Sequence, residues 1–362
     1  MESNFKFLTF HNFSNAKTQM KLKEQKAKSK SEKPRRRKRE KSKKFEQLEI
    51  SKPIQLTLFD LERDEENYSH SIELYDFIPK YVWGKVERLN GKFLDSLKRE
   101  FECRGRKYFL TLMPARIEVD DGFKEFYPSK REELVEDALR KLMTERQSLM
   151  LDGEAGIIFT LYQLQKELKE KGHSLDYDQL KESLEILTKV DIEIKSEDTE
   201  VQLFFSPIET LGLRGKGSET QTFVRFSPLV THSIKSGTYR LINYDKVMSY
   251  RSVIARQLHK RMSHHFTQAS FTESYEILLT TIVRDFGLTP QKRIQQNLVE
   301  VENAIEEMKE KNVVLSCKVD KIFDSKPRTK LIDAKFKFQP HFDFIADVKR
   351  ANARAKRMRG ST

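Results

Sequence analysis

The chain has 362 residues, of which 37% are hydrophobic, and a formal net charge of +13 at pH 7. That length gives room for two ordinary domains with flexible tails. No apolar stretch is long enough for a transmembrane helix, and the N-terminus lacks the apolar core of a secretory signal. Cys103 and Cys317 are far apart and have no nearby histidines, which excludes a Cys-rich zinc site and a disulfide framework. We therefore expect a cytoplasmic protein with no membrane partner, no metal and no cofactor.

The positive charge is concentrated near the two ends of the sequence. Residues 1–53 carry 17 Lys and Arg against 6 Asp and Glu, and residues 348–362 carry 6 basic and no acidic residues, so the body between them is slightly acidic. Basic tails suit a polyanion such as DNA, although such tails also serve as plain solubilising segments. Residues 15–44 are too polar to offset their ordering entropy. We expect disordered tails over 1–53 and 341–362, and the basic run at 33–44 leaves a nuclear localisation signal as an alternative.

A short apolar island, residues 54–68, follows the first tail and contains the peptide Gln55-Leu56-Thr57-Leu58-Phe59. This peptide resembles the motif that docks on the bacterial sliding clamp, whose usual form is Gln-Leu-Ser/Asp-Leu-Phe. Leu58 and Phe59 can fill an apolar pocket while Gln55 hydrogen-bonds at its rim, and an unfolded segment supplies the extended shape on binding. The alternative is a strand of the folded body.

Strands and then helices are predicted for the first half of the body. Aromatic and branched residues indicate strands at 71–84 and 106–119. Apolar spacing and capping residues indicate helices at 129–146, at 160–172 and at 174–190, the last capped by Ser174 or Asp176. Strand-like segments follow at 191–196, 201–213 and 220–230. Short helices closed by a β-hairpin are typical of a winged helix, a variant of the helix-turn-helix.

The same order recurs in the second half. Helices are expected at 244–266, 274–287 and 289–312, with Thr289 as the cap of the third helix and Pro290 at its first position. Strands at 313–319 and 330–338 flank a turn. An internal repeat of one unit is informative even without sequence identity. We therefore predict an α+β protein with two tandem winged-helix domains, over 69–232 and 233–340.

Residues 237–266 contain a recognisable pattern, which consists of Tyr239, Leu241, Asn243, Tyr244, the run Ala255-Arg256-Gln257-Leu258, and Phe266. On these residues the chain resembles the plasmid replication initiators, especially the branch called replication initiator protein A, and its segment 174–187 is similar to that family's first recognition helix. The resemblance implies binding to double-stranded DNA repeats in a plasmid origin and melting of adjacent AT-rich DNA. It also implies recruitment of host replisome components, among them the initiator ATPase and the replicative helicase, and leaves monomer and homodimer open.

Candidate DNA contacts follow from the chemistry of groove reading, in which Gln pairs with adenine and Arg with guanine. In the second unit they are Gln291, Lys292, Arg293, Gln295 and Gln296; in the first unit they are Ser174, Tyr177, Gln179 and Lys181. Phosphate contacts are expected from Arg214 and Lys216 in a glycine-rich hairpin and from Arg251, Lys260 and Arg261 on a long helix. Arg256 is expected to be partly structural. The alternative for each group is an ordinary solvated face, and acidic neighbours weaken the case for the first unit.

Signals of catalysis are absent from the sequence. It has no Walker-type phosphate loop and no HUH motif, and the adjacent His264 and His265 point apart on a helix. We expect a binding protein and not an enzyme such as a relaxase or nuclease. A tandem winged-helix transcriptional repressor is the alternative function, and the clamp-like peptide favours the initiator because a repressor does not need it.

Overall fold

The computed structural model describes residues 68–84, 86–120, 122–145, 149–151, 153–198, 201–289, 294–324 and 330–360. The chain divides into two units, Met1–Lys52 and Pro53–Thr362, and every described residue belongs to the second. The expected N-terminal tail, the clamp-like peptide at 55–59, and Pro290, Gln291, Lys292 and Arg293 lie outside the described residues.

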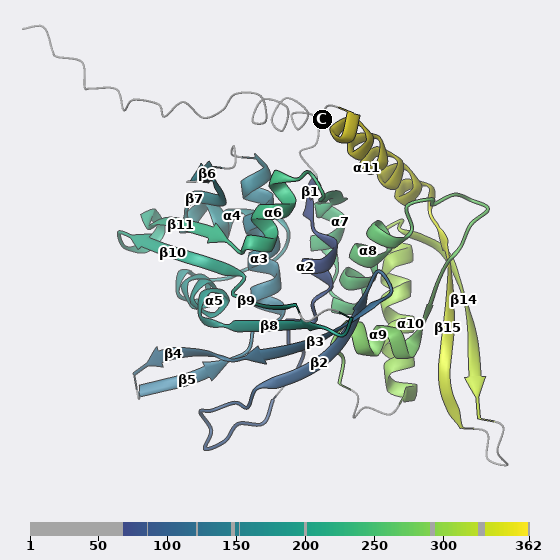
Figure 1. Cartoon of the computed structure of the whole chain (residues 1–362), viewed down its shortest axis with the longest axis horizontal. Coiled ribbons are helices and arrows are strands. Elements are labelled where there is room, and N and C mark those ends of the chain that lie inside the picture. Colours follow the sequence, from purple (N-terminus) through teal and green to yellow (C-terminus); the bar gives the residue numbers. More distant parts are fainter. Residues whose placement is uncertain are drawn as a thin grey trace, which may run out of the picture. The chain divides into compact units, whose positions relative to one another are not determined.

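Two stretches of the described chain repeat one order of elements, namely helix, strand, helix, helix, strand, strand (Figure 1). In the first stretch these are α3 (Lys130–Glu145), β7 (Glu154–Thr160), α4 (Leu161–Glu170), α5 (Tyr177–Lys189), β10 (Ile208–Arg214) and β11 (Gln221–Phe226). In the second they are α8 (Val253–His265), β13 (Tyr275–Leu278), α9 (Leu279–Asp285), α10 (Ile294–Glu310), β14 (Val314–Phe323) and β15 (Leu331–Pro340). The final strand lies between the other two in both sheets, β11 between β10 and β7 and β15 between β13 and β14. The repeat therefore extends to strand pairing.

The first repeat carries additional strands. β8 (Asp191–Ser196) and β9 (Gln202–Phe205) join β2 (Leu97–Cys103) and β3 (Arg106–Met113) in a sheet of order β2-β3-β8-β9. The other pairs are β6 (Leu149–Leu151) with β7, β4 (Ala115–Val119) with β5 (Gly122–Phe126), and β1 (Tyr68–Ser71) with β12 (Arg240–Asn243). The remaining helices are α2 (Glu73–Phe77), α6 (Pro228–Lys235), α7 (Tyr244–Ser249), α11 (Phe342–Gly360) and the short 3-10 helix η1 (Gly217–Glu219). All of these strand pairs are antiparallel. The described chain is therefore a protein of mixed helices and antiparallel strands.

Two hydrophobic cores lie beneath these elements. The first includes buried residues from Tyr68 to Met248, and the second includes buried residues from Tyr250 to Val348. The boundary between the two cores thus falls between Met248 and Tyr250, whereas the sequence predicted a domain boundary between residues 232 and 233. Strand β12 belongs with the first core because it pairs with β1 and buries Leu241 there. None of the described helices is long and apolar enough to cross a membrane.

The expected strand at 71–84 does not form, because strand β1 ends at Ser71 and the short helix α2 follows at Glu73–Phe77. The Asp76 carboxylate accepts hydrogen bonds from the Ile72 backbone N–H at 2.8 Å and from the Ser71 hydroxyl at 2.7 Å, which stabilises the start of the helical turn. Aromatic content alone therefore predicted the wrong element here, because the local Asp side chain competes for the backbone donors.

The expected single helix at 244–266 is two helices, α7 and α8. Tyr250 takes an extended conformation between them, with φ −73° and ψ 132°, and its side chain is completely buried in the second core. Ser252 then caps α8 by accepting a hydrogen bond from the Ala255 backbone N–H. The burial of Tyr250 and the new cap explain the break.

The expected helix at 274–287 begins as strand β13, and α9 starts only at Leu279. Thr280 donates from its backbone N–H and its hydroxyl to the Asp333 carboxylate on β15, at 3.1 and 2.7 Å. The N-terminal cap of α9 is thus supplied from a distant strand, which the local sequence pattern does not reveal.

The prediction of a disordered C-terminal tail over 341–362 is wrong for most of that segment, because helix α11 spans Phe342–Gly360. Phe344, Ile345 and Val348 of α11 are buried in the second core, so this segment does bury enough apolar surface to fold. The same helix contacts the first part of the chain, since Tyr68 donates to Asp347 at 2.5 Å and Arg240 donates to Asn352 at 2.9 Å. Its basic residues are therefore presented by an ordered element.

Candidate nucleic-acid interface

Helix α10 exposes a face suited to reading bases. Leu298, Val301 and Ile305 are buried on its inner side. The exposed side chains in its described first three turns are Gln295, Gln296, Val299 and Asn303. Amide groups can pair with adenine, and valine methyl groups can contact the thymine methyl. The exposed acids Glu306 and Glu310 come only in the later turns, and Glu300 and Glu302 in the earlier turns are partly exposed.

Helix α5 exposes fewer side chains to solvent than α10 does. Asp176 is its cap, and the Gln179 side chain accepts from the Asp176 backbone N–H at 3.0 Å, so this amide oxygen is already used within the protein. Strand β4 packs alongside the helix and buries Ala115 and Ile117. The exposed side chains of α5 are only those of Asp178, Gln179 and Lys189.

The other candidates near α5 are placed differently from one another. Ser174 is exposed just before the helix, Tyr177 is partly buried against the first core, and Lys181 lies 3.7 Å from the Asp178 carboxylate. The acid Glu182 pairs with Arg131 at 2.6 Å, which reduces its repulsion toward phosphate. These contacts favour α10 over α5 as the main base-reading element.

The two hairpins carry exposed cations beside the helices. Arg214 and Lys216 are exposed in the β10–β11 connection, as the sequence indicated. The turn there is tight: Gly215 and Gly217 have φ of 105° and 62°, values that favour glycine. In the β14–β15 hairpin the exposed lysines are Lys318, Lys321 and Lys330, which the sequence analysis did not single out. Lys318 and Lys321 are three residues apart on β14 and Lys330 directly precedes β15, so no strand periodicity groups them, and their position around the predicted turn was the available signal.

The structure corrects part of the expectation for α8. Arg251, just before the helix, is exposed, but Lys260 and Arg261 are only 3% and 7% exposed. Lys260 Nζ lies 2.7 Å from Asp137, and Arg261 Nη1 lies 2.9 Å from Asp285. Lys260 and Arg261 are therefore held by internal carboxylates and are not available to DNA phosphates.

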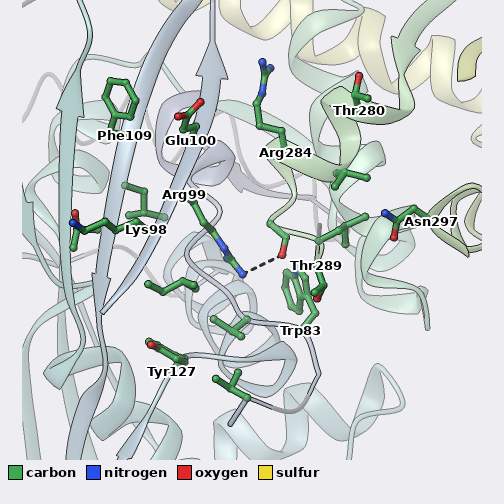
Figure 2. A pocket seen from close by; sticks show the side chains of 18 of the residues that line it. Trp83, Lys98, Arg99, Glu100, Phe109, Tyr127, Thr280, Arg284, Thr289 and Asn297 are labelled. Atoms are coloured by element: carbon green, nitrogen blue, oxygen red, sulfur yellow. Dashed lines mark hydrogen bonds between the residues drawn. The ribbon is translucent and has the colours of Figure 1, made fainter. Parts of the chain in front are cut away.

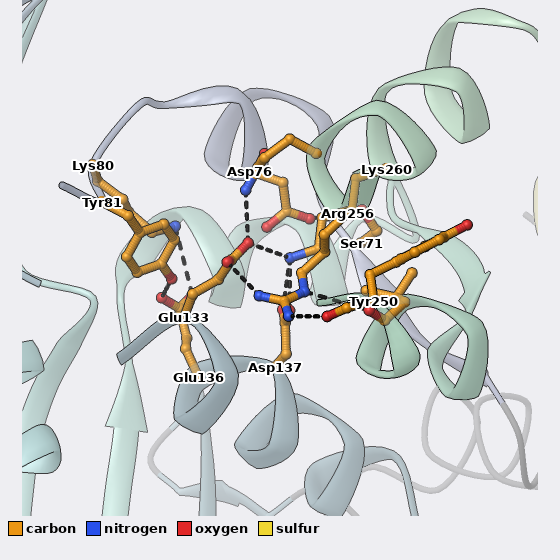
Figure 3. Close-up of polar contacts among 12 residues, drawn as sticks. Ser71, Asp76, Lys80, Tyr81, Glu133, Glu136, Asp137, Tyr250, Arg256 and Lys260 are labelled. Atoms are coloured by element: carbon orange, nitrogen blue, oxygen red, sulfur yellow. Dashed lines mark hydrogen bonds and ion pairs between the residues drawn. The ribbon is translucent and has the colours of Figure 1, made fainter. Parts of the chain in front are cut away.

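A buried network of charges joins α8 to α3 (Figure 3). It comprises the acids Asp76, Glu133, Glu136 and Asp137 and the cations Lys80, Arg140, Arg256 and Lys260, each at most 7% exposed. Arg256 Nη1 lies 2.7 Å from Glu133, and Arg140 Nη1 lies 2.7 Å from Asp76. Four charges of each sign balance, which is the condition under which buried ions are tolerated. The network holds the first helices of the two repeats together.

The pKa shifts of Asp76 and Lys260 agree with the geometry of this network. Burial by itself would raise the pKa of Asp76, but the cations of Arg140, Lys260 and Lys80 hold it well below its usual range. Burial would lower the pKa of Lys260, but Asp137 and Glu133 raise it above the ordinary value. Both groups are therefore ionised at neutral pH, as an ion-pair network requires.

Burial governs the chemistry of the two cysteines and of His264. Burial raises the pKa of the Cys103 thiol to about 12 and that of Cys317 to about 11, so neither is an activated nucleophile. Among the described residues, no group of three or more His, Cys, Asp or Glu could hold a metal ion. His264 is buried and hydrogen-bonds the Ser71 hydroxyl at 2.8 Å.

No protein-family model and no curated protein matches the sequence. Among solved structures the chain is similar to selenomethionine derivatives of domains 2 and 3 of RctB, with a TM-score of 0.47 and 9% identity, over 72% of this chain and 95% of that one. A second structure of RctB domains 2–3 gives a TM-score of 0.45 and 8% identity, over 76% and 99%. The Pi initiator protein in complex with iteron DNA gives 0.41 and 13%, over 63% and 97%.

Proposed function

We propose that this chain is a sequence-specific DNA-binding protein that initiates plasmid replication, and that its two repeats are tandem winged-helix domains. The observation that carries the proposal is the exposed face of α10, which presents Gln295, Gln296, Val299 and Asn303 and has its exposed acids, Glu306 and Glu310, only in the later turns. In a helix-turn-helix the second helix of the motif enters the major groove with its N-terminal residues against base edges. Helix α10 holds that place in the second repeat.

Phosphate contacts come from the hairpins and from chain segments beside the helices. Lys318, Lys321 and Lys330 serve the second repeat, and Arg214 and Lys216 serve the first. Arg251, exposed before α8, adds another cation. These groups are scattered over a body with little net charge, so they steer and orient the protein while α10 supplies sequence preference. The candidates Lys292 and Arg293 belong to the same reading surface in this proposal.

Origin function rests on the resemblance to plasmid replication initiators and on the peptide at 55–59. Docking of this peptide on the bacterial sliding clamp would bring a replisome component to the bound origin. Recruitment of the host initiator ATPase and the replicative helicase belongs to the same proposal. The chain acts by binding and carries out no catalysis, so purified protein with Mg²⁺ is expected to leave supercoiled origin plasmid uncut.

Footprinting with the purified full chain on DNA flanking its own gene tests the proposal. Protected tandem repeats beside an AT-rich stretch are the expected result. A single protected operator over a promoter, without repeats, would instead favour the transcriptional repressor. Equal protection of all sequences would reject sequence-specific binding altogether.

A further inference from the structure

The turn that follows α9 is held by two side chains from the N-terminal part of the described chain, Trp83, which packs against the second core, and Arg99 of strand β2 (Figure 2). The Trp83 indole Nε1 donates to the Phe286 carbonyl at 2.7 Å, and Arg99 Nη2 donates to the Gly287 carbonyl at 3.0 Å. Both acceptors are carbonyls at the C-terminal end of a helix, where intrahelical partners run out and the helix dipole favours a cation. Trp83 and Arg99 therefore supply hydrogen-bond donors to carbonyls at this helix end, and Arg99 adds the positive charge that the helix dipole favours.

Arg99 is equally anchored on its own side. It lies on strand β2, and its Nη1 donates to the Tyr81 carbonyl at 2.7 Å and to the Pro79 carbonyl. All of these acceptors are main-chain oxygens, so the guanidinium links the backbone of one repeat directly to the backbone of the other. Burial lowers the pKa of Arg99 to about 10, which leaves the group charged at neutral pH. Its planar fork of donors suits this bridging role, which a lysine cannot reproduce.

Gly287 is shaped to receive this side chain. A Cβ at this position would lie 2.5 Å from Arg99 Nη1 and 2.6 Å from Arg99 Cζ, closer than real contacts allow. The residue also has φ +63°, which favours glycine. The sequence thus has a glycine where the guanidinium passes and where the backbone turns.

The surroundings of Arg99 make this contact individually important. Arg99 lies on the wall of an open cleft of about 1190 Å³, whose lining includes Leu97 and Phe109 from the β2–β3 hairpin and Val283 and Asn297 from α9 and α10. Other contacts also join β2 to α9, since the Glu102 backbone N–H donates to the Asp285 carboxylate at 3.2 Å and Arg284 Nη2 lies 3.1 Å from Glu102. Arg99 differs from them because it reaches the main-chain carbonyl of the turn itself. The lining carries both signs of charge, with the acids Glu87 and Glu100 beside the cations Lys98, Arg99 and Arg284, so the cleft is not a distinctly basic groove for phosphate.

We propose that Arg99, with Trp83, is a positioning residue that fixes the orientation of α10 relative to the DNA-contacting elements of the first repeat. This inference rests on the proposed function for its biological meaning, but its geometry stands without it. Leu288, directly after the turn, is buried in the second core, and Asn297 of α10 lines the same cleft, so a movement of the turn is passed on to α10. The consequence is that the spacing between the two contacted DNA segments is set by this bridge.

A distance measurement between spin labels at Ser174 and Gln296, both exposed, tests the bridge without DNA. The full chain carries Cys317→Ser so that this partly exposed cysteine takes up no label. Cys103 is buried and unreactive and is left in place. The unmodified bridge is expected to give a narrow distance distribution, and Arg99→Met a clearly broader or shifted one. The control Arg104→Ala removes an exposed cation from the same hairpin, paired only within the first repeat, and should change nothing.

Trp83→Phe provides a second variant, which removes the indole donor and keeps a smaller aromatic ring, and its result is used if Arg99→Met does not fold. An unchanged distribution in the folded variants would overturn the inference. If the full chain gives no sequence-specific footprint, the proposed function fails while the label distances still decide on the bridge.

Binding to the footprinted repeat provides the second readout. One base pair inserted between the contacted segments displaces them by about 3.4 Å and rotates them by about 34–36°. We expect the unmodified chain to lose about tenfold in affinity for the inserted site and Arg99→Met to lose less than about threefold. A merely structural role would weaken both sites alike, and the same insertion penalty in both proteins would reject the positioning role.

Discussion

Neutralising Glu133 should strongly destabilise the fold. Its carboxylate accepts from Arg256 Nη1 at 2.7 Å and from Gln257 Nε2 at 2.6 Å, and the side chains of Glu133 and Arg256 are both 0% exposed. Glu133→Gln keeps the volume but leaves Arg256 as an uncompensated buried charge. Breaking a buried pair in this way costs about 3–5 kcal/mol, a large share of the roughly 5–15 kcal/mol that stabilises a typical protein.

Urea unfolding followed by circular dichroism measures this loss, and a fall in the midpoint of about 1–2 M is expected. Glu182→Gln is the matched control, since Glu182 pairs with Arg131 at 2.6 Å but is 34% exposed, and it should cost less than about 1 kcal/mol. Adding Arg256→Met to Glu133→Gln should cost less than the sum of the single changes, because the pair is coupled. A Glu133→Gln protein as stable as the control would refute the reasoning that this network holds the repeats together.

Burial lowers the pKa of His259 to about 3, below the roughly 6.5 of an unfolded chain, so stability is complete above pH 6.5 and is lost as the pH falls toward 3. This residue alone should lower the unfolding free energy by about 2 kcal/mol between pH 7 and pH 5, and His259→Gln should reduce that loss in urea titrations. Gln296→Ala should weaken the cognate site by about 1–3 kcal/mol in gel-shift assays and spare random DNA, whereas Glu310→Ala, at the far end of the same helix, should spare both. Leu58→Ala with Phe59→Ala should abolish capture by purified sliding clamp and keep DNA binding, since two apolar side chains contribute roughly 1.5–3 kcal/mol each; undiminished capture would reject the motif. Affinity should fall steeply with salt, with a slope of about −5 on logarithmic axes if six cations contact phosphates, and a flat response would contradict phosphate binding.

Local patterns predicted the helices of the first repeat well. The apolar spacing around Leu164 and Leu184 places both residues in the first core, and Asp176 caps α5 as one of the two expected candidates. These features depend on side chains within a few residues of one another. The break at Tyr250 and the cap of α9 by Asp333 depend on contacts across the fold, so the sequence pattern alone did not predict them.

The candidate site was predicted unevenly for a related reason. Counting charge treats every Lys and Arg as exposed, which is wrong for Lys260 because its carboxylate partner Asp137 comes from the other repeat. A signal was present: Glu133 and Asp137 are four residues apart, as are Arg256 and Lys260, so two helices could pair matching charges. Whether Arg293 and its neighbours read bases stays a prediction.

The contact between α11 and the first strand has a consequence for how the chain folds during synthesis. Tyr68 donates to Asp347 across a sequence separation of 279 residues. At roughly 5–20 residues per second, about 15–55 s pass between the synthesis of these two partners. During that time β1 lacks its α11 contacts on the ribosome. Chains cut short before Phe342 would lose them for good, and such fragments should be the first to reach chaperones and proteases.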